Sequence, residues 1–385
     1  MSFARSTFPR TISAFASAIL LLTVLSVSYP SLVVADSVSA QGDSNALAHD
    51  GQQSVLSMTS HLATEADIDA LKARLGVRQP GETYEPVVVD GFGTGISPRS
   101  EADWQGLVGQ MVVYEVVALP TELSGAFDLS GEPEFPTVGD QAAQGSCSAW
   151  AATYYSYGYL EAVDNAWTEA SQGNSSQLLS PAWTYNMVNG GRDQGSWVDT
   201  NMMVVRDWGA ATMAAMPYDD DDPTSWGSPE AFREASLHRA SEVGYIDYSP
   251  STTVDSIKAL VAAGTPVAFA MDANEFTSGF SDGNYVISSA EYSSTSLNHA
   301  QTIVGYDDSL SDDGDSGAFR VVNSWGADWG DSGYYWLTYS ALEELGELGI
   351  LYLNFMVDIQ GYQPSLVGVW HFDSAPSRAA SISIG

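Results

Sequence analysis

Cys147 is the only cysteine of the 385-residue chain, and a thiol in a suitable setting can act as a nucleophile. It follows Gly145-Ser146, a pair typical of a loop end, and apolar side chains then recur at helical spacing: Trp150, Tyr154, Tyr157 and Leu160. The pattern predicts that Cys147 lies in the first turn of a helix, where unpaired N–H groups and the helix dipole favour a thiolate. We expect this setting to lower the thiol pKa from its usual value near ~8.5. The alternative is a small buried apolar side chain with no chemical role.

A cysteine nucleophile needs a base, and the base needs a group that orients it. His299 suits the first role, because it opens an apolar strand-like segment after a serine-rich loop. Asn323 ends a second strand-like segment and suits the second role, since it can accept the ring N–H of His299. A turn-forming role for Asn323 is the alternative. Three other histidines are expected on solvated surfaces: His49, His61 and His238.

Three motifs, in this order, resemble the papain family of cysteine peptidases. They are a glutamine separated by five residues from Cys147, a His-Ala pair that opens a strand containing Val-Gly-Tyr, and Asn-Ser-Trp-Gly-Ala-Asp-Trp-Gly-Asp-Ser-Gly-Tyr from Asn323. The last motif is the most specific. The resemblance covers about residues 126 to 340.

The resemblance implies that Cys147 is the nucleophile, His299 its ion-pair partner and general acid/base, and Asn323 the residue that orients His299. It also implies that Gln141 donates its side-chain amide to an oxyanion hole beside the Cys147 N–H. The substrate-binding residues that it implies are Gly195, Ser196, Asn298, Ala300 and Trp325. Trp325 would also shield the Asn–His hydrogen bond from water. We expect no metal site and no cofactor.

Two positions depart from the family pattern. Gln144 stands where the family has a cysteine, and Ser148 stands where it has an aromatic residue. The missing cysteine is the one that forms a disulfide in the family, which agrees with a chain that has no second cysteine. Ser148 changes the volume beside the nucleophile, and we expect Trp150 to fill it.

The fold that the resemblance implies is α+β: a papain-like two-lobe fold, with a helical lobe packed against a β-barrel-like lobe and the active-site cleft between them. The residue patterns agree with this division. Helices are predicted at 178–188 and 198–208, and strands at 266–271, 285–287, 299–306, 318–323 and 333–338.

The chain is expected to have four parts. Residues 1–35 have the basic, apolar and small-residue regions of a secretory signal peptide, with an uncleaved anchor as the alternative. Residues 36–125 form an N-terminal extension, either a propeptide that covers the cleft or a structural addition, with helices after Thr64 and Ser100 and a strand at 111–119. Residues 126–345 form the peptidase domain, and 346–385 a C-terminal extension that begins a small β module.

The charge limits the partners. The 48 acidic and 13 basic residues give a formal net charge of −35, so the chain lacks the basic surface that nucleic-acid binding requires. The expected partners are protein or peptide substrates, with membrane contact only through the N-terminal segment, and the protein is expected to be a monomer. The acidic excess favours a saline environment over an ordinary acidic secreted protein.

These observations together predict a secreted or cell-surface cysteine endopeptidase that hydrolyses peptide bonds through a Cys-His-Asn triad and a thioester acyl-enzyme. Two alternatives remain open. One is a catalytically impaired papain-fold surface or adhesion protein, and the other is a thiol transpeptidase or acyltransferase.

Overall fold

The computed structural model describes residues 56–364, except 83, 121, 277–279, 281 and 282. These residues belong to one unit of the chain, residues 37–367. The predicted signal peptide at 1–35 and most of the predicted C-terminal β module lie outside the described residues. Within the described part, no helix combines the length and the apolar character needed to cross a membrane.

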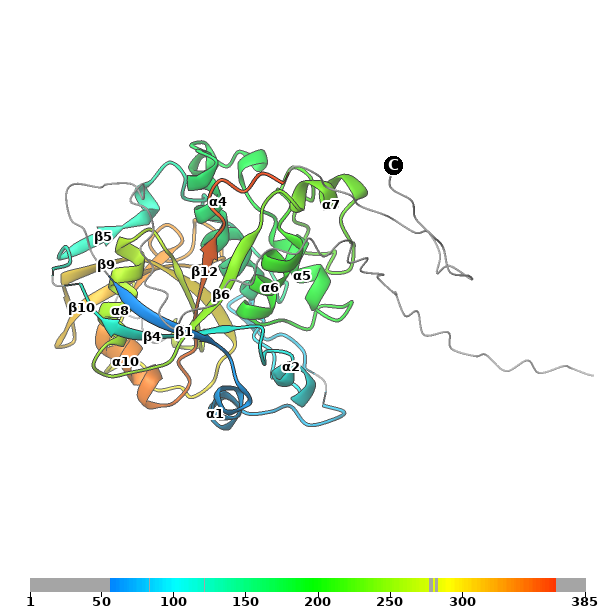
Figure 1. Ribbon diagram of the computed structural model, residues 1–385. Helices are drawn as coiled ribbons and strands as arrows, with labels where there is room; N and C mark the ends of the chain where they lie inside the picture. The colour runs from blue at the N-terminus through cyan, green and yellow to red at the C-terminus, as the bar shows by residue number, and fades with distance from the viewer. Residues whose placement is uncertain (1–55, 83, 121, 277–279, 281–282, 365–385) are drawn as a thin grey trace, which may run out of the picture. The chain divides into compact units, whose positions relative to one another are not determined.

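A mixed sheet of ten strands organises the fold (Figure 1). Its order is β1-β4-β6-β12-β7-β9-β10-β11-β8, and β5 pairs with β9. The strands are β1 (Ser57–Leu62), β4 (Val112–Ala118), β5 (Ala126–Asp128), β6 (Ala240–Ile246), β7 (Val267–Met271), β8 (Val286–Ile287), β9 (His299–Asp312), β10 (Asp315–Val322), β11 (Tyr334–Thr338) and β12 (Leu353–Asp358). A separate hairpin pairs β2 (Val88–Val89) with β3 (Phe92–Gly93). The fold is therefore α+β, as the sequence predicted.

The helices gather largely between β4 and β6 in the sequence. The described ones are α1 (Glu65–Leu75), α2 (Glu101–Gln105), α3 (Cys147–Ala149), α4 (Gly158–Asp164), α5 (Pro181–Val188), α6 (Val198–Trp208), α7 (Pro229–Ala235), α8 (Thr253–Ala262) and α10 (Tyr339–Glu347). A π-helical stretch, η2 (Trp150–Tyr157), joins α3 to α4, so a single helical segment runs from Cys147 to Asp164. Short 3-10 turns are η1 (Leu129–Gly131), η3 (Ala170–Gln172) and η4 (Ser175–Gln177).

The antiparallel pair β9 and β10 positions two residues of the site. Val322 pairs with Thr302, so Asn323 follows β10 at the end of the pair where β9 begins with His299. Both strands are rich in buried β-branched and aromatic side chains, which suit a central sheet position. The acidic residues 307–315 fall at the opposite end, around the turn at Asp313-Gly314.

The N-terminal extension is part of this sheet. β4 pairs in parallel with β6, and β1 pairs with β4 on the outer side. The predicted helix starts are confirmed, since Thr64 and Ser100 each form a capping box with the aspartate three residues later. Apolar side chains of the extension share one core cluster with Cys147, α5 and α6: Ile68, Leu71, Ile96, Trp104, Leu107, Met111 and Val113.

Three features differ from the sequence-based expectations. β12, which falls in the predicted C-terminal extension, lies inside the sheet between β6 and β7. The sequence analysis did not predict β6, whose pattern is interrupted by Gly244. The expectation of a solvated His238 was wrong, because its ring packs against Trp167 and its Nδ1 lies 2.7 Å from a carboxylate oxygen of Glu161.

Candidate active site

Three elements bring Cys147, His299 and Asn323 together. Cys147 is the first residue of α3, His299 is the first of β9, and Asn323 directly follows β10. His299 Nε2 lies 2.7 Å from Asn323 Oδ1, and the Ala300 N–H donates to Cys147 Sγ at 3.4 Å. The thiol therefore lies against the start of the strand that carries the histidine. All three side chains are fully buried.

The hydrogen bonds of Asn323 determine which nitrogen of His299 carries the proton. Asn323 Oδ1 also accepts the backbone N–H of Ser324 at 2.8 Å, which identifies this atom as the oxygen and makes His299 Nε2 a donor. His299 Nδ1 is buried and has no hydrogen-bond partner among the described residues. In the neutral ring Nδ1 is thus an acceptor, free to receive a proton.

The Trp325 indole covers this hydrogen bond. Its ring centroid lies 4.6 Å from that of His299, with 36° between the planes, and the residue is buried. Phe276 packs edge-on against both rings. The apolar surroundings keep water away from the bond between His299 and Asn323.

Gln141 reaches the same site from the loop before α3. Its Nε2 donates to the Gln144 carbonyl at 2.8 Å and to the Gly93 carbonyl at 3.0 Å, and its Oε1 accepts from the Ser324 hydroxyl at 2.6 Å. Trp325 Nε1 donates to the same Gly93 oxygen at 3.1 Å. Two side-chain donors therefore converge on one carbonyl oxygen, an arrangement that can also stabilise an oxyanion.

Residues 92–97 of the N-terminal extension lie over the site, and we call them the covering segment. The N–H groups of Gly95 and Ile96 donate to the Asn298 carbonyl at 2.8 and 3.0 Å. On the other side, the Ser196 N–H donates to the Gly95 carbonyl at 2.8 Å, and Ile96 forms a parallel bridge with Ser196. The covering segment is thus held by backbone hydrogen bonds from both flanks, as an extended peptide would be.

This close approach requires glycine. A Cβ on Gly95 would lie 2.0 Å from the Gly145 carbonyl oxygen, and a Cβ on Gly195 would lie 2.3 Å from the Gly95 oxygen. Gly195 also has a φ of 75°, a left-handed conformation that glycine adopts at little cost. The two chains therefore meet backbone against backbone.

Burial under the covering segment controls the ionisation of the site. It raises the pKa of Cys147 to about 12 and lowers the pKa of His299 to about 4. The expectation of a lowered thiol pKa was therefore wrong for this state, because the desolvation penalty exceeds the stabilisation from the helix terminus. Near neutral pH the covered site holds a thiol and a neutral imidazole.

The predicted substrate-binding residues surround the covering segment in different ways. Gly195 and Ser196 face it through their backbone, and Asn298 does so through its carbonyl. The Asn298 side chain points elsewhere, since its Nδ2 donates to Asp272 at 2.6 Å. Ala300 is buried, and its N–H donates to Cys147 Sγ.

Ser148 has a defined partner. Its hydroxyl donates to the Ser196 carbonyl at 2.8 Å and so links the nucleophile helix to the wall that pairs with the covering segment. The Trp150 ring packs against Tyr154 and Tyr218, with centroids 4.7 and 4.9 Å away.

Asp193 is a site residue that the sequence analysis missed. Its carboxylate accepts the Gly145 N–H at 3.0 Å and the Tyr185 hydroxyl, and that hydroxyl accepts the Gly195 N–H at 3.1 Å. This chain of bonds joins the loop before Cys147 to the wall at Gly195. The only signal in the sequence is its place two residues before Gly195, in a run that reads as an ordinary loop.

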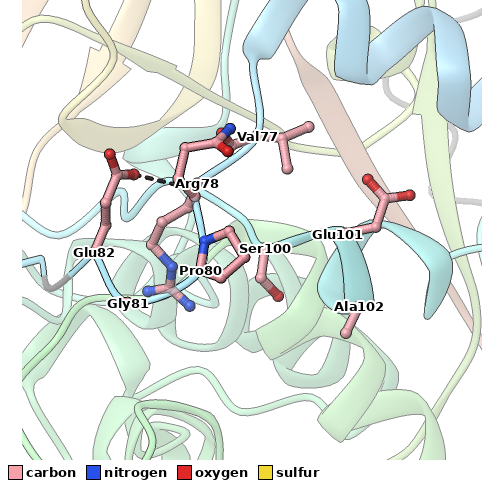
Figure 2. Close-up of a pocket in the computed structure, with 9 residues that line it drawn as sticks. Val77, Arg78, Pro80, Gly81, Glu82, Ser100, Glu101 and Ala102 are labelled. Atoms are coloured by element: carbon pink, nitrogen blue, oxygen red, sulfur yellow. Dashed lines mark hydrogen bonds between the residues drawn. The ribbon is translucent and has the colours of Figure 1, made fainter.

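Figure 2 shows a pocket formed by residues of the extension. It has a volume of about 640 Å³ and is lined by residues 77–82 and 100–102 of the extension, where the Gln79 N–H donates to Glu82 at 2.8 Å. None of the triad residues lines it.

Comparisons with known proteins agree with this geometry. The family model described as "Papain family cysteine protease" matches residues 124–348. The chain is 32% identical over 202 residues to a cathepsin L-like peptidase of Aedes aegypti and 30% identical over 199 residues to cathepsin L of Sarcophaga peregrina. Each alignment covers 51% of this chain and 53% of the relative, so the chain spans about half the length of these relatives.

Solved structures are also similar. Xylellain, a cysteine protease from Xylella fastidiosa, aligns with a TM-score of 0.47 at 21% identity, over 72% of this chain and 96% of that one. Digestive procathepsin L 3 of Tenebrio molitor larval midgut aligns with a TM-score of 0.46 at 23% identity, over 62% and 71%. The family match extends over more than half of the chain and includes Cys147, His299 and Asn323. The chain belongs to the papain family of cysteine proteases.

Proposed function

We propose that this protein is a cysteine endopeptidase, made as a latent precursor, in which Cys147, His299 and Asn323 form the catalytic triad. The observation that carries the proposal is the hydrogen bond between His299 Nε2 and Asn323 Oδ1, which leaves the buried Nδ1 without a partner among the described residues, while the N–H of the next residue, Ala300, donates to Cys147 Sγ. The family match supports the same assignment.

In the proposed reaction, His299 Nδ1 takes the proton of Cys147, and the thiolate sulfur attacks the carbonyl carbon of a peptide bond. The negative oxygen that forms is stabilised by the Gln141 amide and the Cys147 N–H. The His299 imidazolium then gives its proton to the leaving amine, and the C–N bond breaks to leave a thioester. Water, deprotonated by His299, hydrolyses the thioester and returns the thiol.

The covering segment makes the precursor latent in this proposal. The Gly93 carbonyl takes the Gln141 donor, and Gly95 and Ile96 take the backbone positions on both flanks. A peptide substrate needs the same donors and acceptors. Hydrolysis therefore requires that the extension first be cleaved or displaced, and the signal peptide predicted at 1–35 would place this step in a secreted protein.

The test compares wild-type protein with Cys147→Ala and Cys147→Ser. We expect the wild-type protein, once freed of its extension, to hydrolyse unfolded protein and to react stoichiometrically with iodoacetamide at pH 5 to 6, where an ordinary thiol is protonated. Cys147→Ala should have no activity and Cys147→Ser little. Hydrolysis by purified Cys147→Ala would refute the assignment.

Product analysis separates hydrolysis from the other thiol chemistries. Incubation with a peptide and an added amine nucleophile should give free carboxyl termini as the main products. A predominance of ligated products would indicate a transpeptidase instead. Absence of both products, with Cys147 unlabelled after removal of the extension, would indicate a protein that keeps the fold without the chemistry.

A further inference from the structure

Arg99, which follows the covering segment by two residues, is buried in an unusual environment for a cation. Its side chain is 2% exposed and pairs with Asp199 of α6, which is 0% exposed. The guanidinium carbon lies 4.4 Å from the ring centroid of Trp197, 4.7 Å from Trp104 and 5.9 Å from Tyr352. Aromatic faces and a carboxylate are the groups that bind a guanidinium most favourably.

Most of this environment belongs to the peptidase domain. Trp197, Asp199 and Tyr352 lie within or directly after the region that matches the family, whereas Arg99 and Trp104 come from the extension. The two oxygens of Asp199 have separate partners, since one binds Arg99 and the other accepts the Tyr352 hydroxyl. The peptidase domain therefore supplies the carboxylate and two of the aromatic rings, and the extension supplies the cation.

We propose that, in the protein freed of its extension, Trp197, Asp199 and Tyr352 form a pocket that binds a guanidinium side chain of a peptide substrate. The proposal rests on the proposed peptidase function. It assigns a substrate class to that function: peptides with an arginine at a fixed distance from the bond that is cleaved.

The backbone contacts show that a substrate can reach this pocket. The chain from Gly95 to Arg99 runs alongside residues 195–199, through the Ser196 N–H bond to Gly95 and the Trp197 Nε1 bond to the Ser97 carbonyl. Arg99 is three residues beyond Ile96, which an extended chain spans in roughly 10 Å. A substrate held by the same backbone groups would have one side chain at the pocket.

Two further observations favour an exchangeable occupant. Nη1 of Arg99 is buried without a hydrogen-bond partner among the residues that the structure describes, so the present cation is incompletely satisfied. The net charge of −35 also favours the approach of cationic peptides.

The experiment uses protein that is folded as the full chain and then processed, with removal of the extension verified by intact mass and N-terminal sequencing and retention of the fold by circular dichroism. Its substrates are pairs of peptides that differ only in arginine or citrulline, a neutral residue of nearly the same shape, placed in turn at each position near the cleaved bond. At one position we expect kcat/KM for the arginine peptide to exceed that for the citrulline peptide by about tenfold or more, because the buried carboxylate discriminates charge.

The double variant Arg99→Gln/Asp199→Asn tests the role of Asp199. It removes both charges from the precursor, so no buried arginine is left unpaired. Residue 99 leaves with the extension, so the processed variant differs from the wild type only at 199. It should lose the preference for arginine, so that kcat/KM is the same for the arginine and the citrulline peptide. Glu230→Gln, on an exposed carboxylate of α7, is the control and should keep the preference.

The outcomes separate this inference from the peptidase function. Equal rates on arginine and citrulline peptides at every position, by wild-type protein, would overturn the pocket and leave the peptidase assignment intact. No hydrolysis of any peptide would refute the peptidase function and the pocket with it. The wild-type comparison decides the question even where the double variant does not fold.

Discussion

At Cys147 two physical effects act in opposite directions, and burial prevails. A helix N-terminus stabilises a nearby anion by about 0.3–1 kcal/mol at exposed sites. Full burial has the larger effect and raises the thiol pKa to about 12, which at about 1.4 kcal/mol per pKa unit amounts to several kcal/mol. The helix terminus can therefore favour a thiolate only after water regains access to the site.

Gln141 is predicted to act through its side-chain amide. In Gln141→Ala protein freed of its extension, we expect kcat to fall by about 10²–10³ with a smaller change in KM, because one oxyanion donor is lost in the transition state. Steady-state kinetics on a peptide substrate measures both. A rise in KM alone, with kcat unchanged, would show that Gln141 has no such role.

Asp193 is predicted to position the loop before Cys147 rather than to react. Asp193→Ala removes the acceptor for Gly145 and Tyr185 and should lower kcat/KM about tenfold, the equivalent of roughly 1.4 kcal/mol. Asp193→Asn keeps an oxygen acceptor and should retain most activity. Burial raises the Cys147 pKa and the Asp193 charge adds to this, so Asp193→Asn should also shift thiol alkylation to lower pH. Equal losses in both variants, with no shift, would contradict this role.

At the scale of elements, the extension has two structural roles. β1 and β4 extend the sheet of the peptidase domain through β6, while the covering segment between them lies on the site. Both ends are therefore anchored by strand pairing, and the backbone hydrogen bonds of Gly95 and Ile96 hold the covering segment between them. The covering segment can therefore exclude water from the site although it is short.

Gly95→Ala tests the covering segment. The added Cβ would lie 2.0 Å from the Gly145 carbonyl oxygen, so the segment must move away from the site. We expect the unprocessed variant to react faster with a thiol reagent than wild-type precursor and to have measurable activity. After processing the variant and the wild type should be identical, because residue 95 is then absent.

Gly125→Ala is the matched control, since nothing lies within 4 Å of a Cβ at that position. It should leave the precursor latent. A Gly95→Ala precursor as unreactive as wild type would show that the segment does not control access to Cys147.

For the whole molecule, the covered state should lose stability in acid. Burial lowers the pKa of His299 to about 4 from an ordinary value of about 6.5. Between these values the uncovered state binds a proton and the covered state does not, so the free energy of opening falls as pH drops from about 6.5 towards 4, by up to roughly 3 kcal/mol. The test below uses Cys147→Ala protein, so ionisation of the thiol does not enter the measurement.

Hydrogen exchange of the Gly95 and Ile96 amides measures this opening in Cys147→Ala protein, which cannot process itself. Protection, corrected for intrinsic exchange, should decrease between pH 6.5 and 4.5. The additional change His299→Gln should flatten the dependence. The same decrease in both proteins would assign it to other groups, such as surface carboxylates.

Much of the fold could be predicted from the sequence because the signals are local. Thr64 and Ser100 start helices through bonds to residues three positions away, and the apolar pattern of 299–306 identifies a buried strand wherever it lies. The strand β6, which the sequence analysis did not predict, lacks such a local signal. β6 contains a glycine and is stabilised by β4 and β12, which are more than a hundred residues away in the chain.

The sequence by itself determined which residues could do chemistry, since the order and spacing of Cys147, His299 and Asn323 are local facts of the chain. Only the tertiary structure decided their state: which histidine nitrogen is free, that the Gly93 carbonyl takes the Gln141 donor, and that Arg99 pairs with Asp199. These depend on contacts between distant segments and on the exclusion of water. Burial, which shifts the pKa of both Cys147 and His299, is a property of the packed molecule and of no single stretch of residues.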